Sequence, residues 1–393
     1  MKSLRDRLDI IEKRICNDDI TIMIIGLGSV GTYLLNYLIS RNDPAIRIVA
    51  VGRDYAKMES KVNISRIAGL IRNENKSEII IEGGVDLADI DQIRFAIEKY
   101  DPAFIINSSR AYAGLKYGSI SWHNVRAYGI WTPLSIKYTK NIMQAADEAD
   151  TNAVVINTSY SDAVIPWLRS AGKAYPDFGS GNINHLIPRM KYAVADILGI
   201  KDFWNVDIML ACSHFHDVVI SKEGQSEGQK LLLKAFYNGK ELDVKQEDIL
   251  SRCSIPMPTD ATRNMMNASS NYQIIDAFIR AVRTGEDQRV FSPGVFGEVG
   301  GYPVTVGYRD GRLDAYIDES VYSVEEMRKA NKDSIYLDGV EGIADGCLIY
   351  TDELIEKAKQ AFNTELPKKV AFNDIETVAQ FIIDNIILPQ TEK

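Results

Sequence analysis

The segment ACSHFHD, residues 211–217, places two of the chain's four histidines, His214 and His216, one residue apart and next to Asp217. Histidine is the side chain whose ordinary pKa lies nearest to neutrality, so a pair beside a carboxylate suits proton transfer or metal binding. On an extended strand, residues two apart point to the same face, which would bring both imidazoles together. Three interpretations follow: an acid–base site, a pair of metal ligands, or polar residues of a loop.

A second segment, IIGLGSVG, carries the spacing G-x-G-x-x-G between a predicted strand and a predicted helix. The first glycine permits a tight turn, the second lets a pyrophosphate approach the backbone, and the third lets helix and strand pack closely. An ordinary packing turn is the alternative interpretation. We predict a dinucleotide-binding turn whose contact residues are Gly26, Leu27, Gly28, Ser29, Val30 and Gly31.

The residues after the second predicted strand bear on the choice of cofactor. An acidic side chain there binds the ribose 2′-hydroxyl of NAD, whereas the 2′-phosphate of NADP requires a cation. The sequence is AVGRD, so Arg53 follows a glycine at the usual acidic position. We therefore favour NADP over NAD. Alternatively, Asp54 binds NAD after a shift of register.

Composition narrows the class of protein. Of 393 residues, 46% are hydrophobic and 25% are charged, and the formal net charge is −9. These are the proportions of a globular protein, and the negative charge argues against nucleic acid or anionic membrane as a partner. Four widely spaced cysteines favour a reduced, intracellular protein. Because no apolar run approaches ~18 residues, we expect no membrane span and a cytoplasmic location.

The elements that must position these residues follow from hydrophobic periodicity. A helix is predicted over 3–17, and strands near 20–26, 46–52, 78–84, 103–109 and 153–159 alternate with helices, which is typical of a doubly wound parallel sheet. Beyond residue 160 we predict helices near 187–199 and 260–284, strands over 202–213 and 218–224, a β-rich stretch over 289–317, and a helix capped by Ser323 and Glu326. Two further helices are predicted around Pro367.

The order of several motifs resembles the lactate/malate dehydrogenase family, over about residues 20–345. They are NSSRAYAG after the fourth strand, VVINTSYSD after the fifth, FGSGNINHLIPRMKYAVADILGI, ACSHFHD, and GEVGGYPVTVGYRDGRLDAYI. The resemblance implies an α/β protein with an NAD(P)-binding Rossmann domain (20–160) and an α+β catalytic domain (161–346). Hydrophobic periodicity adds an N-terminal helix (1–19) and a helical extension (347–393). The resemblance also implies hydride transfer between a nicotinamide and a 2-hydroxy acid or 2-oxo acid, and a homodimer or homotetramer.

Residue roles are also implied by this resemblance. Arg189 matches the arginine that binds the substrate carboxylate, and His214 matches the proton donor. Arg110 or Arg126 matches the loop arginine that polarises the carbonyl. Ser108 and Asn157 match residues beside the cofactor, and Asn157 also orients the substrate. These residue types suit the reaction, because arginine binds carboxylates through two hydrogen bonds and histidine exchanges protons near neutral pH.

The chain departs from the family at the carboxylate that normally holds the histidine. Three residues before Arg189 stands Leu186, so we expect Asp217 or Asn184 to orient His214 instead. The segment after the fourth strand is also unusually aromatic, with Tyr112, Tyr117, Trp122, Tyr128 and Trp131. These rings favour either a bulky substrate or a lid or subunit contact.

Two other functions remain open. The NAD- and metal-dependent glycoside hydrolases share the core fold, and in that interpretation His185 and His214 are metal ligands, although Asn184 replaces a cysteine ligand. The third class is a non-catalytic NADP-binding protein, supported by the missing aspartate alone. Otherwise, we expect no metal.

Overall fold

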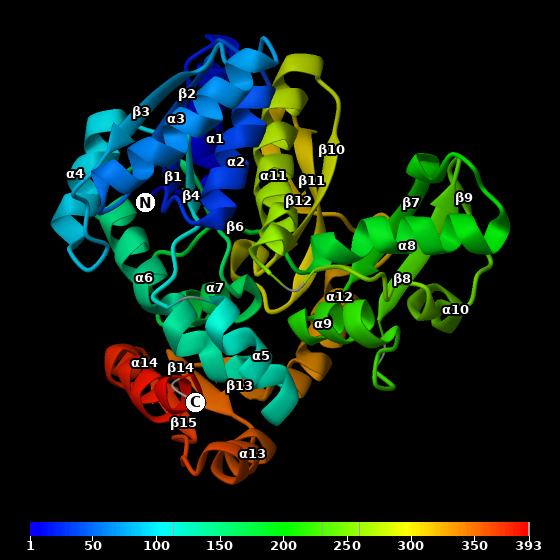
Figure 1. Cartoon of the computed structure of the whole chain (residues 1–393). Coiled ribbons are helices and arrows are strands. Elements are labelled where there is room, and N and C mark those ends of the chain that lie inside the picture. The colour runs from blue at the N-terminus through cyan, green and yellow to red at the C-terminus, as the bar shows by residue number, and fades with distance from the viewer. Residues whose placement is uncertain (113, 230, 259, 392–393) are drawn as a thin grey trace.

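The computed structural model describes residues 1–112, 114–229, 231–258 and 260–391, except for the side chains at 114–117, 119 and 391. At its centre is a parallel sheet with the strand order β3-β2-β1-β4-β5-β6, which confirms the predicted doubly wound α/β architecture (Figure 1). Its strands are β1 (Ile20–Ile25), β2 (Ile46–Val51), β3 (Glu78–Glu82), β4 (Phe104–Asn107), β5 (Val154–Asn157) and β6 (Phe178–Gly179). Because β6 belongs to this sheet, the sheet extends past the predicted boundary at residue 160.

The central sheet is buried on both faces, because successive side chains of a strand point to opposite sides. In β1, Ile22 and Ile24 pack in one hydrophobic core, whereas Met23 and Ile25 pack in another. The first core includes side chains of α1 (Leu4–Cys16), α2 (Ser29–Ser40), α3 (Tyr55–Ile71) and α11 (Asn264–Thr284). The second includes side chains of α4 (Ile90–Tyr100), α6 (Thr132–Glu148) and α7 (Ser161–Ser170).

A second lobe projects to one side of the central sheet (Figure 1). Its antiparallel strands are β7 (Val206–Ala211), β8 (Leu232–Tyr237) and β9 (Lys240–Glu241), with helices α8 (Ile183–Leu198), α9 (His214–Glu223) and α10 (Gln246–Ser251). The prediction of a strand over 218–224 is wrong, since these residues lie in or directly after α9. Between the lobe and the central sheet lie β10 (Gln288–Pro293), β11 (Gly301–Arg309) and β12 (Arg312–Ile317), as the β-rich stretch predicts.

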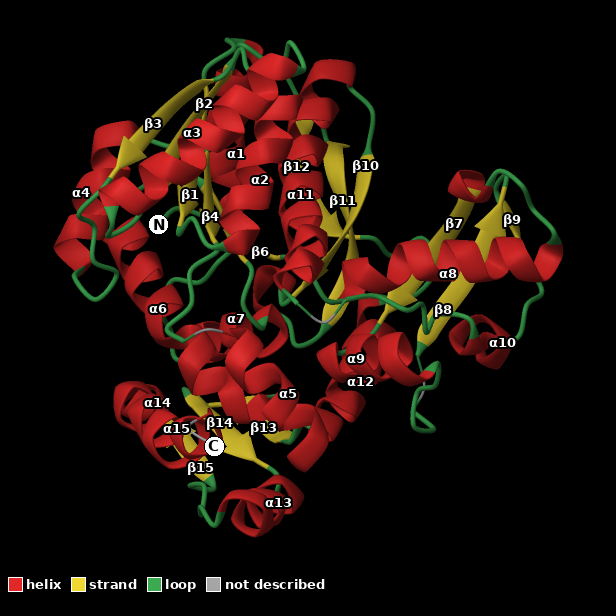
Figure 2. Ribbon diagram, viewed as in Figure 1, coloured by secondary structure: helices red, strands yellow, loops and turns green. Residues whose placement is uncertain are grey.

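The C-terminal part contains a sheet that the sequence did not predict (Figure 2). Helix α12 (Val324–Ser334) has the predicted capping box of Ser323 and Glu326. The elements that follow are β13 (Val340–Ala344), β14 (Cys347–Tyr350), α13 (Asp352–Phe362), β15 (Lys369–Ala371), α14 (Ile375–Ile382) and α15 (Leu388–Thr391). The hairpin of β13 and β14 crosses the predicted boundary at 346/347. No helix in the described part of the chain is both long and apolar enough to cross a membrane.

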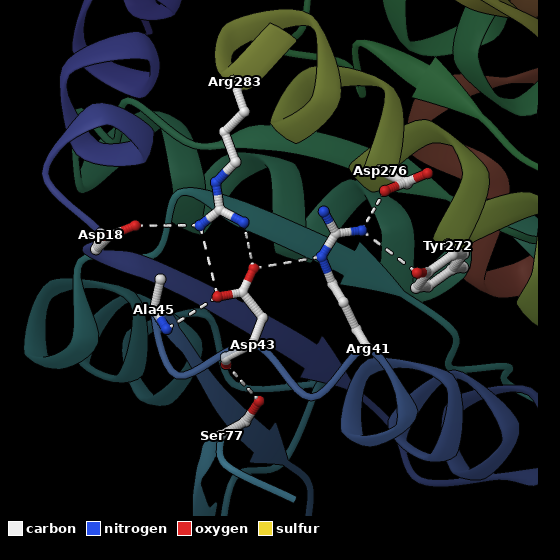
Figure 3. A network of polar contacts seen from close by, with 8 residues as sticks. All are labelled: Asp18, Arg41, Asp43, Ala45, Ser77, Tyr272, Asp276 and Arg283. Atoms are coloured by element: carbon white, nitrogen blue, oxygen red, sulfur yellow. Dashed lines mark hydrogen bonds and ion pairs between the residues drawn. The ribbon is translucent and has the colours of Figure 1, made fainter. Parts of the chain in front are cut away.

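A polar network fastens α11 to the central sheet (Figure 3). Asp43, in the loop between α2 and β2, accepts hydrogen bonds from the Arg283 guanidinium at 2.5 Å and from the Ala45 amide at 3.1 Å. Arg41 contacts the same carboxylate at 3.4 Å and also pairs with Asp276 of α11. The carboxylate therefore joins two arginines from elements far apart in sequence, and this fixes the helix whose first turns border the cavity described next.

Candidate functional site

A cavity of about 1310 Å³ lies at the carboxyl ends of the central strands. Its walls come from the loops after β1, β2, β4 and β5 and from the first turns of α8, α9 and α11. In open parallel sheets, ligands bind at this edge because the loops there converge around the point where the strand order reverses. The volume exceeds what a small 2-oxo acid would fill, and leaves room for a dinucleotide.

The glycine-rich turn forms one end of this cavity. Five of the six predicted contact residues line it, and the sixth, Gly31, packs directly against the turn. A β-carbon at Gly31 would lie 2.2 Å from the carbonyl oxygen of Gly26, whereas one at Gly28 would meet nothing within 4 Å. Gly26 has φ +90°, a conformation that favours glycine. Gly26 and Gly31 therefore meet the conformational and packing requirements of the motif, and Gly28 leaves the space that a pyrophosphate would require.

Helix α2 begins at this turn, and its first backbone N–H groups are suited to bind an anion. Gly28 is the N-cap, no side chain caps the helix, and its first turn carries no acidic residue. Unpaired N–H groups and the helix dipole attract phosphate. Ser108 also lines the cavity and donates a hydrogen bond to the Gly26 carbonyl at 2.6 Å, which holds the turn in place. These residues fit the pyrophosphate of a dinucleotide.

The residues beyond β2 bear on the 2′ position of the ribose. Arg53, Asp54 and Lys57 all line the cavity. The Asp54 carboxylate caps α3 by accepting a hydrogen bond from the Lys57 amide at 3.0 Å. One acidic side chain is thereby engaged with its own helix, while two cations stand beside it. Arg53 forms no ion pair within the described part of the chain.

The opposite end of the cavity contains His214, and its carboxylate partner is Asp338. The His214 Nδ1 atom lies 2.6 Å from the Asp338 Oδ2 atom. The expectation that Asp217 or Asn184 orients this histidine is wrong. Asp338 also accepts hydrogen bonds from the Tyr160 hydroxyl and the Tyr128 amide, both at 2.6 Å.

Asp338 controls the charge of His214. Burial by itself lowers the pKa of His214, but the nearby Asp338 carboxylate outweighs burial and raises that pKa to about 9. The rings of Tyr160 and Tyr128 stand edge-on to the imidazole, with centroids 4.7 Å and 5.2 Å away. They limit its rotation and its contact with water. At neutral pH the site therefore holds an imidazolium.

His216 has a different environment, because helix α9 begins at His214. The two histidines do not share a face as they would on a strand, since neighbours two apart on a helix point about 200° away from each other. His216 is fully buried, and burial lowers its pKa to about 4. Its Nδ1 atom lies 3.3 Å from the Ser213 hydroxyl. It is a neutral core histidine.

Asp217 pairs with a third histidine, His185 of α8. The His185 Nδ1 atom lies 3.3 Å from the Asp217 Oδ2 atom, and both residues line the cavity. Burial opposes ionisation of Asp217, but His185 and then His214 keep its pKa below the ordinary value. The cavity thus has two His–Asp pairs. Asn184 instead donates to the Ser270 hydroxyl at 2.6 Å.

Several residues named by the resemblance lie away from the cavity. Arg189 is buried, donates to the Cys253 carbonyl at 2.8 Å and is not among the lining residues. Asn157 is also buried beneath the site, where Asn107 and Ser161 contact its side chain at 3.0 Å and 3.1 Å. Arg126 pairs with two glutamates, and the nearer oxygen of Glu223 lies 2.7 Å away. For Asn157 to contact either cofactor or substrate, as predicted, its side chain would have to leave these buried contacts.

Other cations line the cavity in their place. Arg110, Arg263 and Lys222 are lining residues, and none forms an ion pair within the described ranges. Lys222 lies over the Trp122 ring, 5.1 Å from its centroid. The resemblance predicts a role for Arg110 but assigns none to Arg263 or Lys222. Cations without a counter-charge at a cavity wall favour an anionic ligand.

Asp338 and Asp162 were also missed. Asp338 ends a short 3-10 helix, η5 (Ile335–Asp338), beyond every motif of the resemblance. Asp162 is buried behind Asn182, which donates to one of its oxygens at 2.6 Å, while burial raises the pKa of Asp162 to about 6. The one sequence signal for Asp162 was its position in VVINTSYSD, and for Asp338 there was none.

The aromatic segment after β4 forms one wall of the cavity. Tyr112, Trp122, Tyr128 and Trp131 are lining residues, whereas the side chain of Tyr117 lies outside the described residues. Part of this segment is helix α5 (Gly114–Asn124). The rings add apolar surface beside α9, since the centroid of the Trp122 ring lies 6.3 Å from that of Phe215.

The proposed metal ligands of the alternative function, His185 and His214, both line the cavity. Each has its Nδ1 atom at a carboxylate. Within the described ranges, no group of three or more histidine, cysteine or acidic side chains is arranged to hold a metal ion.

Comparison with solved structures identifies the fold as that of malate and lactate dehydrogenases. The malate dehydrogenase of Cryptosporidium parvum is 12% identical with a TM-score of 0.51, over 81% of this chain and 98% of that one. The malate dehydrogenase of Plasmodium falciparum is 13% identical with a TM-score of 0.51, over 88% and 99%. The lactate dehydrogenase of C. parvum is 14% identical with a TM-score of 0.51, over 81% and 95%. No protein-family model and no curated protein sequence matches the chain.

Proposed function

We propose that this protein is an NAD(P)-dependent oxidoreductase that transfers a hydride between the nicotinamide and the C2 carbon of a 2-hydroxy acid or 2-oxo acid. The observation that carries the proposal is that His214, paired with Asp338, lines the same cavity as the glycine-rich turn. A proton donor and a dinucleotide site are therefore available to one substrate. The non-catalytic alternative depended on a histidine without a carboxylate, and Asp338 removes that support.

The bound dinucleotide would supply the hydride donor or acceptor. His214 would donate a proton to the oxygen of a 2-oxo acid as C2 is reduced, and would take it back in the reverse direction. Asp338 acts as a positioning residue, because its contact with Nδ1 leaves Nε2 as the nitrogen available to substrate. Its negative charge also stabilises the imidazolium, as in other carboxylate–histidine pairs.

We propose that Arg263 and Arg110, rather than Arg189, bind the substrate carboxylate. Both line the cavity, and neither is paired with a carboxylate in the described part of the chain. Arg189 is instead held by the Cys253 carbonyl, and burial lowers its pKa. Arg110 follows β4 and Arg263 precedes α11, so they approach the cavity from the central sheet and from the second half of the chain.

We further propose that NADP is preferred to NAD. Arg53 and Lys57 supply positive charge near the end of β2, while Asp54 is engaged in capping α3. A 2′-phosphate gains charge-assisted hydrogen bonds there, whereas a 2′-hydroxyl has one acidic acceptor that is already used.

The experiment incubates the protein with NADPH and a panel of 2-oxo acids of increasing size. Oxidation of NADPH is measured as the loss of its nicotinamide absorbance, with and without a chelator. Chelator-resistant oxidation of NADPH supports the proposal, and chelator-sensitive cleavage of a glycoside would favour the metal-dependent alternative. Arg263→Met should raise KM at least tenfold with a smaller change in kcat. Arg280→Met, an exposed arginine on α11, is the matched control and should leave both constants unchanged.

We also propose a homo-oligomer. The outward face of α3 exposes Ile64, Ile67 and Ile71 to 65%, 56% and 78%. Their i, i+3, i+7 spacing forms one apolar stripe, which a second copy would cover. Light scattering should give a dimer or larger, and Ile67→Lys should shift it toward the monomer; a monomeric wild-type protein would contradict the proposal.

A further inference from the structure

The second His–Asp pair has no role in simple hydride transfer. Reduction of one carbonyl requires one proton at one oxygen, which His214 supplies. His185 nevertheless lines the same cavity, with its Nδ1 atom 3.3 Å from Asp217. Its Nε2 atom is buried and has no hydrogen-bond partner among the described residues. A buried polar atom without a partner costs free energy, so such an atom beside a cavity calls for a ligand.

The two pairs lie next to each other. Asp217 stands three residues after His214 in α9, and residues three apart on a helix are neighbours on its surface. The same carboxylate contacts His185 from α8. Asp217 therefore lies between the two imidazoles, and its negative charge acts on both. In the proposed reaction, a substrate whose oxygen meets His214 would have its neighbouring atoms available to His185, which lines the same cavity.

The atom next to C2 of a 2-oxo acid is C3, whose hydrogens are acidified by the adjacent carbonyl. We propose that His185, positioned by Asp217, is a second acid–base group that moves a proton at C3, so that the enzyme enolises its 2-oxo acid as well as reducing it. The substrate class is thereby narrowed to 2-oxo acids with at least one hydrogen on C3. This inference rests on the proposed function, because it places the carbonyl oxygen at His214.

The step is balanced without any redox partner. The His185 Nε2 atom takes the C3 proton, and the pair of electrons from the C3–H bond forms the C2=C3 double bond. The pair from the C=O bond moves to the oxygen, which receives the proton of His214. The enol is thus formed with His185 protonated and His214 neutral. Reversal returns a proton to C3, and in heavy water that proton is a deuteron.

The experiment follows exchange at C3 by proton NMR in D2O, with 2-oxobutanoate and 2-oxoglutarate as probes and NADP⁺ present, so that no hydride is available. Hydride transfer is measured separately with NADPH and the same probes. For wild type we expect exchange well above the buffer rate. The ratio of exchange rate to hydride-transfer rate should fall at least tenfold in His185→Gln and in Asp217→Asn.

His123→Gln is the matched control, because His123 is an exposed histidine at the same cavity. Its ratio should equal that of wild type. Thermal melting identifies a variant that fails to fold. If one of His185→Gln and Asp217→Asn does not fold, the other is sufficient for the test. Hydride transfer without exchange, or an unchanged ratio in both variants, overturns the inference and leaves the proposed function intact. Exchange without hydride transfer supports the inference and overturns the reductase. If neither probe undergoes either reaction, both are overturned.

Discussion

The two ends of the cavity are built in different ways. At the proposed nucleotide end, a strand, a glycine turn and a helix form one continuous segment, in which Gly26 and Gly31 contact each other across five residues. The loops after β2 and β4 complete this end with Arg53 and Ser108. The acid–base end is assembled from distant segments, and 124 residues separate His214 from Asp338. The comparison shows that a local motif builds the turn proposed to bind the dinucleotide. The histidine's charge, in contrast, depends on how the whole chain packs.

Replacing Asp338 should have the largest effect, because it removes the carboxylate at the acid–base end and leaves the glycine turn unchanged. In Asp338→Asn, burial acts on His214 without a compensating carboxylate, so the pKa of His214 should fall by at least two units from about 9. We expect 2-oxo acid reduction at pH 8 to fall on the order of 10² to 10⁴-fold. Asp333→Asn, at an exposed aspartate paired with Lys329, is the control. A pH profile that does not move would refute the role of Asp338.

The pH dependence of the wild-type protein sharpens the same point. With the pKa of His214 raised to about 9, reduction should be constant through neutral pH and decline as pH rises through 9, whereas oxidation should increase over that range. The folded-state pKa is above the unfolded value of about 6.5. The contribution of the His214–Asp338 pair to stability is therefore complete below pH 6.5 and is lost as pH rises through 9. Initial rates in both directions and denaturant unfolding at pH 6 and 9.5 test this.

A pair of glycine variants separates the contribution of the glycine turn to protein stability from its proposed contribution to nucleotide binding. Gly31→Ala forces a β-carbon to 2.2 Å from a carbonyl oxygen, and should cost about 2 kcal/mol of unfolding free energy together with nucleotide affinity. Gly28→Ala meets no protein atom within 4 Å, so stability should be unchanged while nucleotide affinity falls about tenfold. Chemical denaturation and nucleotide titration distinguish the two; equal stability losses would contradict the separation of tasks.

Arg53→Ala tests the cofactor preference with a smaller expected effect. The ratio of NADPH to NADH affinity should fall about tenfold, because one charge-assisted contact to the 2′-phosphate is lost. Titration with both nucleotides measures the ratio. Arg72→Ala, at an exposed arginine after α3 that pairs with Glu74, should leave it unchanged. Equal affinities in the wild-type protein would remove the argument from Arg53.

The smallest effect should come from the network of Asp43. Asp43→Asn weakens the contacts with Arg283 and Arg41, which join α11 to the central sheet (Figure 3). We expect a loss of about 1 to 2 kcal/mol of unfolding free energy and a change in KM of less than threefold. Denaturant unfolding and steady-state kinetics check this. Asp310→Asn, at an exposed turn, should leave both unchanged.

Much of the fold could be predicted because its signals are local. Buried strands such as β1 and β2 appear as apolar runs interrupted only by Thr21 and Arg47, and the capping box at Ser323 follows from two residues three apart. The sequence does not indicate the helix at His214, because HFH alternates polar and apolar residues and the following VVI is an apolar run, as in strands. The sheet of β13–β15 was missed because its strands are short and separated by α13.

In the candidate site, too, features set by local sequence could be predicted and features set by distant contacts could not. Five residues of the glycine turn line the cavity, since a turn positions its own backbone. Arg189 and Asn157 carry the residue types of the family, yet in this structure their side chains are occupied by neighbours in the core. Their types were visible in the sequence, but their partners were not.

The sequence by itself determined the alternation of strands and helices, the glycine-rich turn after β1 and the presence of a histidine at the cavity, because each depends on short continuous segments of chain. Only the tertiary structure decided which carboxylate holds His214, which histidine is buried and neutral, and which arginines face the cavity. A pKa depends on burial and on charges within a few ångströms, whatever their separation in sequence. For His214 that charge is Asp338, which no local pattern announces.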